Sequence, residues 1–244
     1  MIKIIIFSTK LIFTLVALIL FSSCDGGINF VKGSGNVVID TRNITQEFAG
    51  VAVSGGIEVV VVQSDATSVV VEADDNLINH ISTNVIDGVL IISSDYTSFS
   101  SNATMKVTVR MPNIIKLTAS RGSDLNTLGV IKSDKMDIKA ESGSDIQIAI
   151  ESDYIDAKSS GGSDIEISGI ALSLDISTSG GSDIDAKKLM VNDVKAKASG
   201  GSSIEIQPIL TLDAKSTGGS SIDYIGKPKK ILKFEGSGSS VSSR

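Results

Sequence analysis

Four aspartates recur at a regular spacing in the second half of the chain, each at the end of a Gly/Ser run such as SGGSD at residues 160–164. Carboxylate oxygens presented by Gly-rich turns are ligands that calcium prefers, and repeated turns could arrange them in a row. Like charges stacked about 5 Å apart repel by about 1 kcal/mol per pair in water, so such a row needs compensation. The residues are Asp124, Asp145, Asp164 and Asp183.

Two interpretations of this row remain open. In the first, the aspartates bind calcium, although calcium-binding β-rolls use a nine-residue repeat with further glycines that this chain lacks. In the second, each aspartate accepts hydrogen bonds from backbone N–H groups of its own turn, with Lys139 and Lys158 nearby as counter-charges. We favour the second interpretation and therefore expect no cofactor, with calcium as the alternative.

Catalytic chemistry has little support in the sequence. His80 is the only histidine, so neither a histidine-dependent triad nor a His/Cys metal site is indicated. Carboxylate pairs such as Glu166 with Asp185 could serve a polysaccharide lyase or hydrolase, but a repeat generates such pairs automatically. We expect a protein that is not an enzyme, with a polysaccharide-active β-helix enzyme as the alternative. The net charge of −6 and the lack of a basic stripe argue against nucleic acid as a partner.

The elements that position the aspartates form a repeat of 18–21 residues, marked by a glycine at each corner. Aliphatic residues stand three positions after each of these glycines, and polar residues alternate with them, which is the period-two pattern of a strand with one buried face. Units that stack on one another in this way predict an all-β fold, a parallel β-helix or β-solenoid. The glycines are Gly122, Gly143, Gly162, Gly181, Gly201, Gly219 and Gly238, and the aliphatic residues are Leu125, Ile146, Ile165, Ile184, Ile204, Ile222 and Val241.

The first half of the chain follows the repeat loosely. Gly55 and Gly56 resemble a corner, the segment DDNLINHI predicts a short helix or loop, and Asp87-Gly88 predicts a hairpin turn. We expect residues 34–115 to form irregular N-terminal coils and a cap, and residues 116–244 to form regular coils of the same domain. Two separate domains are the alternative.

The N-terminus has the composition of a bacterial lipoprotein signal. Lys3 and Lys10 precede an apolar run, and small residues precede Cys24, the only cysteine. We expect residues 1–23 to be a signal peptide, Cys24 to carry the lipid, and residues 24–33 to be a linker. An ordinary secretory signal is the alternative. Removal of the two lysines would take the net charge from −6 to −8.

The segments FAGVAVSGGIEVVVVQSD, VEADDNLINHI and DGVLII, together with the serial SGGSD corners, resemble the family of auto-transporter adhesin head GIN domains, common in exported proteins of Bacteroidota. The resemblance covers about residues 34–242. It implies a right-handed β-helix or β-solenoid, a location in the cell envelope and an adhesin-like role. The Gly-Ile-Asn motif of the family is matched by Gly55, Gly56, Ile57 and Glu58, with glutamate in place of asparagine.

These observations together predict an exported lipoprotein, anchored by its lipid to the outer membrane and facing either the periplasm or the cell surface. We expect a non-catalytic head that serves in adhesin-like binding or surface display. A structural or sensory envelope component without a specific ligand is the alternative. The expected partners are the membrane, a glycan or protein ligand, and further copies of the chain, because the open strand edges of a solenoid invite association.

Overall fold

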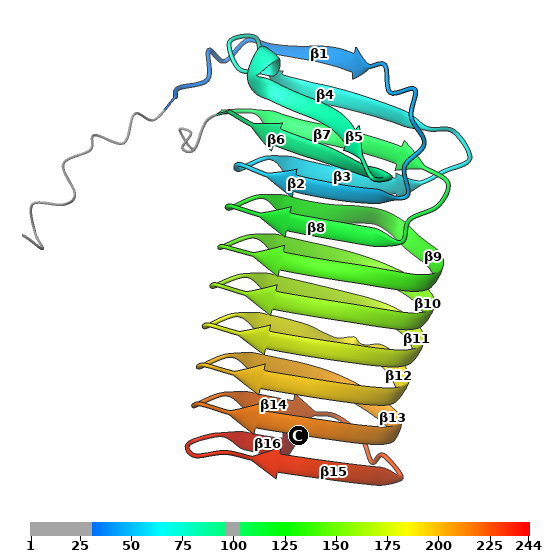
Figure 1. The fold of residues 1–244 in the computed structure, drawn as a ribbon, viewed down its shortest axis with the longest axis vertical. Coiled ribbons are helices and arrows are strands. Elements are labelled where there is room, and N and C mark those ends of the chain that lie inside the picture. The colour runs from blue at the N-terminus through cyan, green and yellow to red at the C-terminus, as the bar shows by residue number, and fades with distance from the viewer. Residues whose placement is uncertain (1–30, 96–102) are drawn as a thin grey trace, which may run out of the picture. The chain divides into compact units, whose positions relative to one another are not determined.

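The computed structural model describes residues 31–95 and 103–244. Residues 32–244 form one compact unit, and the predicted signal peptide and Cys24 lie outside the described residues. Within the described part no helix is long and apolar enough to cross a membrane. The unit is built almost entirely of strands that stack as successive coils, so the predicted all-β parallel solenoid is confirmed (Figure 1).

Five long strands form the regular part of the stack, and each contributes to two faces. They are β9 (Asp124–Glu141), β10 (Asp145–Ser160), β11 (Asp164–Ser179), β12 (Asp183–Ser199) and β13 (Ser203–Thr217). We call the half that follows the glycine corner the first face and the half that leads to the next corner the second face. Neighbouring coils pair in parallel, as in Asp145 with Asp164 and Lys158 with Ser177, with register shifts after the first few residues where β10 meets β9, β11 meets β12 and β12 meets β13.

The glycine corner connects the second face of one coil to the first face of the next. At the corner between β10 and β11, Gly161 and Gly162 have φ values of +71° and +72°. L-amino acids with a side chain rarely adopt this left-handed conformation, so the turn requires glycine at these positions. The following aspartate then begins the next strand.

The coils nearest the N-terminus stack out of sequence order. One coil consists of β2 (Gly50–Ser54) and β3 (Glu58–Gln63), and it lies between the coil of β6 (Val89–Ser94) and β7 (Met105–Met111) and the coil that begins with β8 (Lys116–Ser120). The earliest full coil in the sequence is therefore an interior layer, packed on both sides.

A cap of antiparallel strands closes the N-terminal end. It contains β1 (Val37–Arg42), β4 (Ser68–Asp74), the 3-10 helix η2 (Ile78–His80) and β5 (Ile81–Ile86). β4 pairs antiparallel with both β1 and β7. The hairpin predicted at Asp87-Gly88 is confirmed, because β5 and β6 pair antiparallel across these two residues, both of which have positive φ. The short helix predicted in DDNLINHI is η2.

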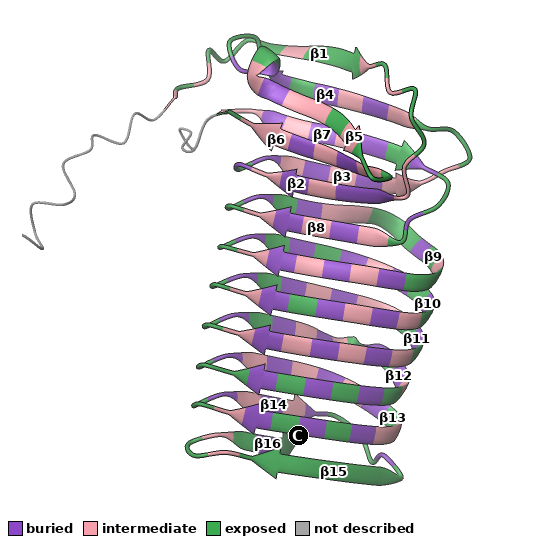
Figure 2. Cartoon of the chain, viewed as in Figure 1, coloured by how far each residue is buried: buried purple, intermediate pink, exposed green. Residues whose placement is uncertain are grey.

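The C-terminal end consists of shorter strands, β14 (Ser221–Tyr224), β15 (Lys230–Glu235) and β16 (Ser240–Ser243). β15 pairs with β13 and is exposed along its whole length (Figure 2). Its inward positions carry charge: Lys233 donates to the carbonyl of Val241 at 3.0 Å, and Glu235 accepts from the Val241 N–H at 2.8 Å. Inward-pointing charges of this kind discourage further strands from adding to an open edge.

The core is a set of aliphatic columns between the two faces. The seven aliphatic residues predicted to point inward after each corner are all buried, from 0% exposed at Leu125 to 5% at Val241. The alternation of buried and exposed residues along β10 and β11 is visible in Figure 2. Burial of each such side chain contributes about 1.5–3 kcal/mol, so the stack of columns is the main source of stability.

Candidate functional site

The predicted row of aspartates exists on the first face. Strand register places Asp124, Asp145, Asp164 and Asp183 directly beside one another, and the row continues through Ser203, Ser221 and Ser240. On its other side the row extends to Glu58, which pairs with Asp124, and then to Lys106. A groove of about 380 Å³ lies along the acidic part of this row.

The carboxylates of the row influence one another. Partial burial raises the pKa of Asp124, and the charges of Asp145 and Glu58 raise it further. Burial likewise raises the pKa of Asp145, followed by the charge of Asp164, while a hydrogen bond from the Asp164 backbone opposes the rise. Only one cation pairs with the row among the described residues: Lys106, whose Nζ lies 3.0 Å from Glu58 Oε1.

Serines, rather than the aspartates, make the side-chain hydrogen bonds that hold the corners. Ser163 is fully buried, donates from Oγ to the Ser160 carbonyl at 3.0 Å and accepts from the Ser144 N–H at 3.3 Å. Ser182 accepts from the Ser163 N–H at 3.1 Å. Ser163 and Ser182 thus link one corner to the next, whereas the sequence analysis expected each aspartate to accept hydrogen bonds from its own turn.

The counter-charges expected for the aspartates are elsewhere. Lys139 and Lys158 lie on the second face, where Lys139 pairs with Glu141 at 2.9 Å and Lys158 with Asp156 at 2.7 Å. The expectation that these lysines neutralise the aspartate row is therefore wrong, because the corner turns the chain from one face to the other between lysine and aspartate.

A second polar column runs beside the aspartate row on the first face. It is neutral at Asn126 and Gln147 and acidic from Glu166 onward, through Asp185, Glu205 and Asp223, so both columns carry carboxylates in the coils of Asp164 and Asp183. Its carboxylates are paired: Lys187 bridges Asp185 and Glu205 at 2.6 and 2.7 Å, and Lys188 and Arg244 contact the others. The second column therefore differs from the aspartate row in having cations beside its carboxylates.

The described residues contain no group of three or more His, Cys, Asp or Glu side chains arranged to hold a metal ion. The aspartates form a line along the stack instead of converging on one point. The row is therefore an acidic strip on the surface, and its geometry provides no cage of the kind that calcium occupies.

The residues that match the family motif form a corner. Ile57 is fully buried, and Gly56 donates its N–H to the Arg121 carbonyl at 3.2 Å and to Ser123 Oγ at 3.0 Å. Gly55 has φ +90° and lies against Ser94. Glu58 points outward at the head of the acidic row. The motif thus supplies one of the turns of the solenoid.

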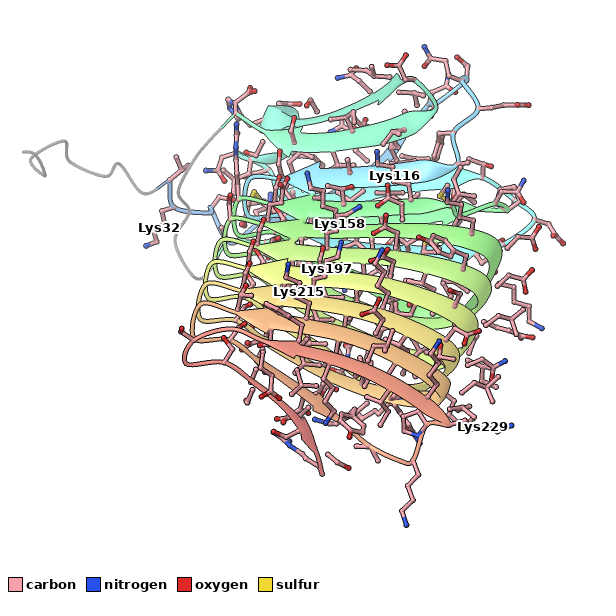
Figure 3. The ribbon with its side chains drawn as sticks, turned by 60° about the horizontal axis from the view of Figure 1, so that its bottom comes forward. Lys32, Lys116, Lys158, Lys197, Lys215 and Lys229 are labelled. Carbon is pink, nitrogen blue, oxygen red and sulfur yellow. The ribbon has the colours of Figure 1, made fainter. Side chains whose placement is uncertain are left out.

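A column of lysines, which the sequence analysis considered only as counter-charges for the aspartates, runs along the second face. Register aligns Lys139, Lys158, Ser177, Lys197, Lys215 and Phe234. A groove of about 520 Å³ follows the four lysines and is lined on its other side by the hydroxyls of Ser160, Ser179, Ser199 and Thr217. Figure 3 shows Lys158 of β10, Lys197 of β12 and Lys215 of β13 in this region. The regular spacing of lysines before each corner was the available signal.

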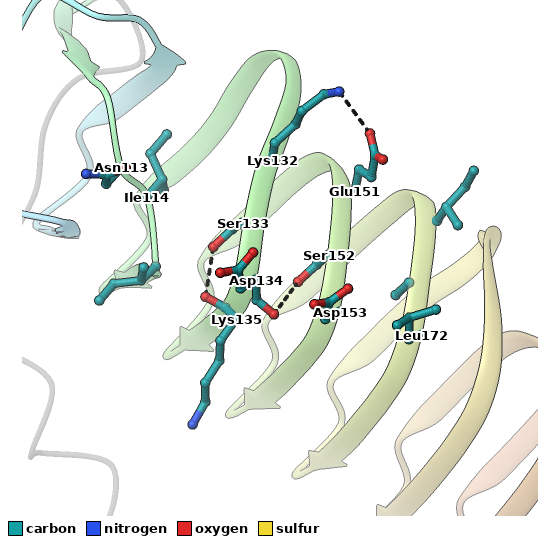
Figure 4. A pocket seen from close by; sticks show the side chains of 13 residues that line it. Asn113, Ile114, Lys132, Ser133, Asp134, Lys135, Glu151, Ser152, Asp153 and Leu172 are labelled. Carbon is teal, nitrogen blue, oxygen red and sulfur yellow. Dashed lines mark hydrogen bonds and ion pairs between the residues drawn. The ribbon is translucent and has the colours of Figure 1, made fainter.

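Another groove, of about 590 Å³, lies at the edge where the strands bend from the first face to the second (Figure 4). Lys132 and Glu151 form an ion pair of 3.2 Å across its rim. Ser152 donates to the carbonyls of Asp134 and Tyr154, at 3.4 and 3.1 Å. Ile170 and Leu172 leave about half of their surface exposed beside it, at 53% and 52%.

The residues considered for catalysis are apart from one another or already paired. His80 lies in the N-terminal cap, with Nδ1 3.8 Å from an Asp95 oxygen. Glu166 and Asp185 are neighbours in register, but each forms an ion pair with a lysine, Lys188 and Lys187 respectively. Two carboxylates held by lysines are poorly placed to act as a general acid and base on a sugar.

Comparisons with known proteins agree on the fold. The model of a family described as "Putative auto-transporter adhesin, head GIN domain" matches residues 47–228. A crystal structure from Bacteroides fragilis, called a "putative adhesin", is 21% identical with a TM-score of 0.82, and the match covers 88% of this chain and 100% of that one. No curated protein matches the chain.

Two further crystal structures have the same fold. One, from Parabacteroides merdae and called a "putative adhesin", is 20% identical, with a TM-score of 0.70 and coverage of 88% and 99%. The other, from Parabacteroides distasonis and called a "Putative lipid binding protein", is 19% identical, with a TM-score of 0.69 and coverage of 88% and 100%. At these identities the likeness concerns the fold alone.

Proposed function

The chain belongs to the family described as "Putative auto-transporter adhesin, head GIN domain", and from this premise we propose that it is a non-catalytic, adhesin-like binding head of the cell envelope. The observation that carries the proposal is the arrangement of outward side chains in columns across at least four consecutive coils. Such columns present the same group at each strand spacing, about 4.8 Å, on a rigid support. A surface of this kind suits an extended ligand that makes many weak contacts.

Within residues 31–95 and 103–244 no carboxylate pair is free to act on one bond, which fits this role. The carboxylates of the second column form ion pairs with Lys187, Lys188 and Arg244. The aspartates of the row lie one after another along the stack and do not face a common point. Adhesion needs repeated contacts over a long surface, whereas glycoside cleavage needs two carboxyl groups free to exchange protons at one bond. We therefore favour binding over a polysaccharide-active enzyme.

We further propose that Cys24 carries the lipid that anchors the head to the outer membrane, on the basis of the signal-like sequence before it. Protease treatment or antibody labelling of intact cells tests the orientation. A head on the cell surface is cleaved by the protease and bound by the antibody, whereas a head in the periplasm is protected from both. Protection would overturn the adhesin-like role. A Cys24→Ser variant should leave the membrane fraction if Cys24 is the anchor.

The competing proposal is a structural or sensory component of the envelope. Adhesion of intact cells to immobilised glycans or matrix proteins separates the two, since deletion of the chain should abolish adhesion only if the head binds a ligand. Envelope defects on deletion, without any loss of adhesion, would favour the structural role.

A further inference from the structure

We propose that the lysine groove of the second face binds a linear acidic polysaccharide, with Lys158, Lys197 and Lys215 contacting its carboxylate or sulfate groups and Phe234 packing against a sugar ring. This inference rests on the proposed function, because it names the ligand class of the binding head. Four observations lead to it: unpaired cations, their spacing, the hydroxyl column beside them and the aromatic ring at one end.

Two of the lysines have no ionic partner within the described residues. Lys139 and Lys158 pair with Glu141 and Asp156, whereas Lys197 and Lys215 have no carboxylate within ion-pair distance in the part of the chain that the structure describes. Lys215 instead lies with Nζ 5.2 Å from the centre of the Phe234 ring. Exposed ammonium groups without a carboxylate partner are available to an external anion, and Lys158 keeps further N–H donors beside its one bond to Asp156.

The spacing of the cations suits a polymer that runs along the stack. Lys197 and Lys215 are direct neighbours in register, one strand spacing of about 4.8 Å apart. Ser177 separates Lys158 from Lys197, so these two lysines are about two strand spacings apart. A single small anion would contact one or two of these groups, whereas an extended polyanion can contact all three.

The opposite wall of the groove consists of hydroxyl groups. Ser160, Ser179, Ser199 and Thr217 stand two residues after the lysine column in successive coils, and they pair in register with one another. Hydroxyls donate and accept hydrogen bonds, so they can interact with sugar hydroxyls as well as with carboxylates.

Phe234 completes the site at the C-terminal end of the groove. It lies in register with Lys215, and 56% of its surface is exposed, so the ring is open to an external ligand. Aromatic rings present a large apolar face, and the C–H groups on one side of a sugar ring can pack against it. An exposed ring in line with a row of cations therefore favours a charged sugar polymer over a small inorganic anion as the ligand.

Other polyanions fit less well. The groove contains no arginine, and Phe234 is the one aromatic residue in the lysine column, whereas proteins that bind single-stranded nucleic acid stack successive bases on several aromatic rings. Its lining contains no aromatic or large aliphatic residue, so it offers no side chain to insert among lipid chains. The acidic row of the first face would repel a polyanion, and on the second face the Asp156 carboxylate is already paired with Lys158.

The test measures binding of the full chain to sodium polygalacturonate and to dextran sulfate, with neutral dextran as the uncharged polymer. We expect both acidic polymers to bind, with affinity that falls as NaCl is raised, and neutral dextran not to bind. Lys197→Ala combined with Lys215→Ala should weaken binding about tenfold or more. Phe234→Ala should also weaken binding of the acidic polymers, whereas Phe234→Tyr, which keeps an aromatic ring, should bind them as the wild-type chain does.

A matched control removes the same charge elsewhere. Lys227 and Lys229 are exposed lysines in the connection between β14 and β15, outside the groove. The double variant Lys227→Ala and Lys229→Ala should change the affinity by no more than about twofold. If it loses as much binding as Lys197→Ala with Lys215→Ala, the effect is one of net charge and the lysine groove is not the site.

Several other results would overturn the inference. Equal or tighter binding of poly(dT) would indicate a general polyanion or nucleic-acid surface, and binding of anionic phospholipid vesicles that requires Lys197 and Lys215 would indicate a lipid surface. Unchanged folding of each variant is checked by its thermal unfolding. If cells lose adhesion on deletion of the chain but keep it with Lys197→Ala and Lys215→Ala, the groove is wrong and the proposed function stands.

Discussion

Lys106 on β7 and Glu58 on β3 form an ion pair of 3.0 Å at the head of the acidic row, although many residues separate them in the sequence. The next member of the row is Asp124, and beyond it Asp145 and Asp164 continue without a paired cation among the described residues. Lys106 thus neutralises one end of a row whose middle carries uncompensated charge. Partial burial raises the pKa values of Asp124 and Asp145, and the neighbouring carboxylates raise them further.

Asp145→Asn should stabilise the protein at neutral pH. Burial and the charge of Asp164 raise the Asp145 pKa above its ordinary value of 3.8, so the folded state binds the proton more tightly than the unfolded state does. Stability is therefore lost as pH rises from about 3.8 through the raised pKa, and the amide avoids this loss. We expect a gain of up to about 1 kcal/mol at pH 7.

The gain should shrink as the pH falls toward 3.8, where the aspartate is itself protonated, and it should also decrease in high salt. Thermal unfolding as a function of pH measures both effects. Asp153 is an exposed residue near the middle of the same strand, and Asp153→Asn makes the same charge change outside the row. An equal gain from Asp153→Asn would show that net charge, and not the row, is responsible.

Ser163→Ala should destabilise the protein by about 1–3 kcal/mol, because it removes a fully buried hydroxyl and leaves the Ser144 N–H without its acceptor. Chemical denaturation measures the loss. Ser221→Ala, in the outward row of a later coil, is the control and should change the free energy of unfolding by less than about 0.5 kcal/mol. Similar losses from both variants would contradict the role of the corner serines.

Gly169→Ala should destabilise the protein more than Gly129→Ala does. Both glycines have positive φ, +122° and +85°, so alanine costs about 1–2 kcal/mol of backbone strain at either site. A β-carbon at Gly169 would also clash with the carbonyl oxygen of Ile150, whereas one at Gly129 meets nothing within 4 Å. The clash should add about 1–3 kcal/mol in equilibrium denaturation. Equal losses would mean that the neighbouring strand moves aside at no cost.

Ile165→Asp should unfold or severely destabilise the domain, since Ile165 is 1% exposed in the inward column and an unpaired buried charge costs several kcal/mol. Ile170→Asp places the same residue in the same strand at a position that is 53% exposed, and it should change stability by about 0.5 kcal/mol or less. Melting temperatures distinguish the two. An Ile165→Asp variant that melts with the wild-type protein would mean that the register is wrong.

Much of the fold follows from the sequence because the repeat imposes strong local constraints. A column from Leu125 to Val241 must be buried, and a fixed spacing of glycines places each turn, so coil length, strand alternation and the aspartate row were all predictable. The hairpin at Asp87-Gly88 was predictable for a similar reason, since two residues with positive φ demand particular side chains.

Other features depend on contacts between distant segments. The insertion of β3 between β7 and β9 is decided by backbone hydrogen bonds and shared burial, which leave no spacing pattern in the sequence. The partner of Glu58 could therefore not be inferred, nor could the role of the corner serines, which depends on the neighbouring corner.

The amino-acid sequence by itself determined that this protein stacks coils with an aliphatic interior and an outward row of aspartates, because inward positions are restricted by packing and repeat at a fixed period. Only the tertiary structure decided which outward groups stand together: Lys106 with Glu58, and Lys215 with Phe234. Outward residues are free of packing constraints, so their association is set by the order in which strands pair across the stack.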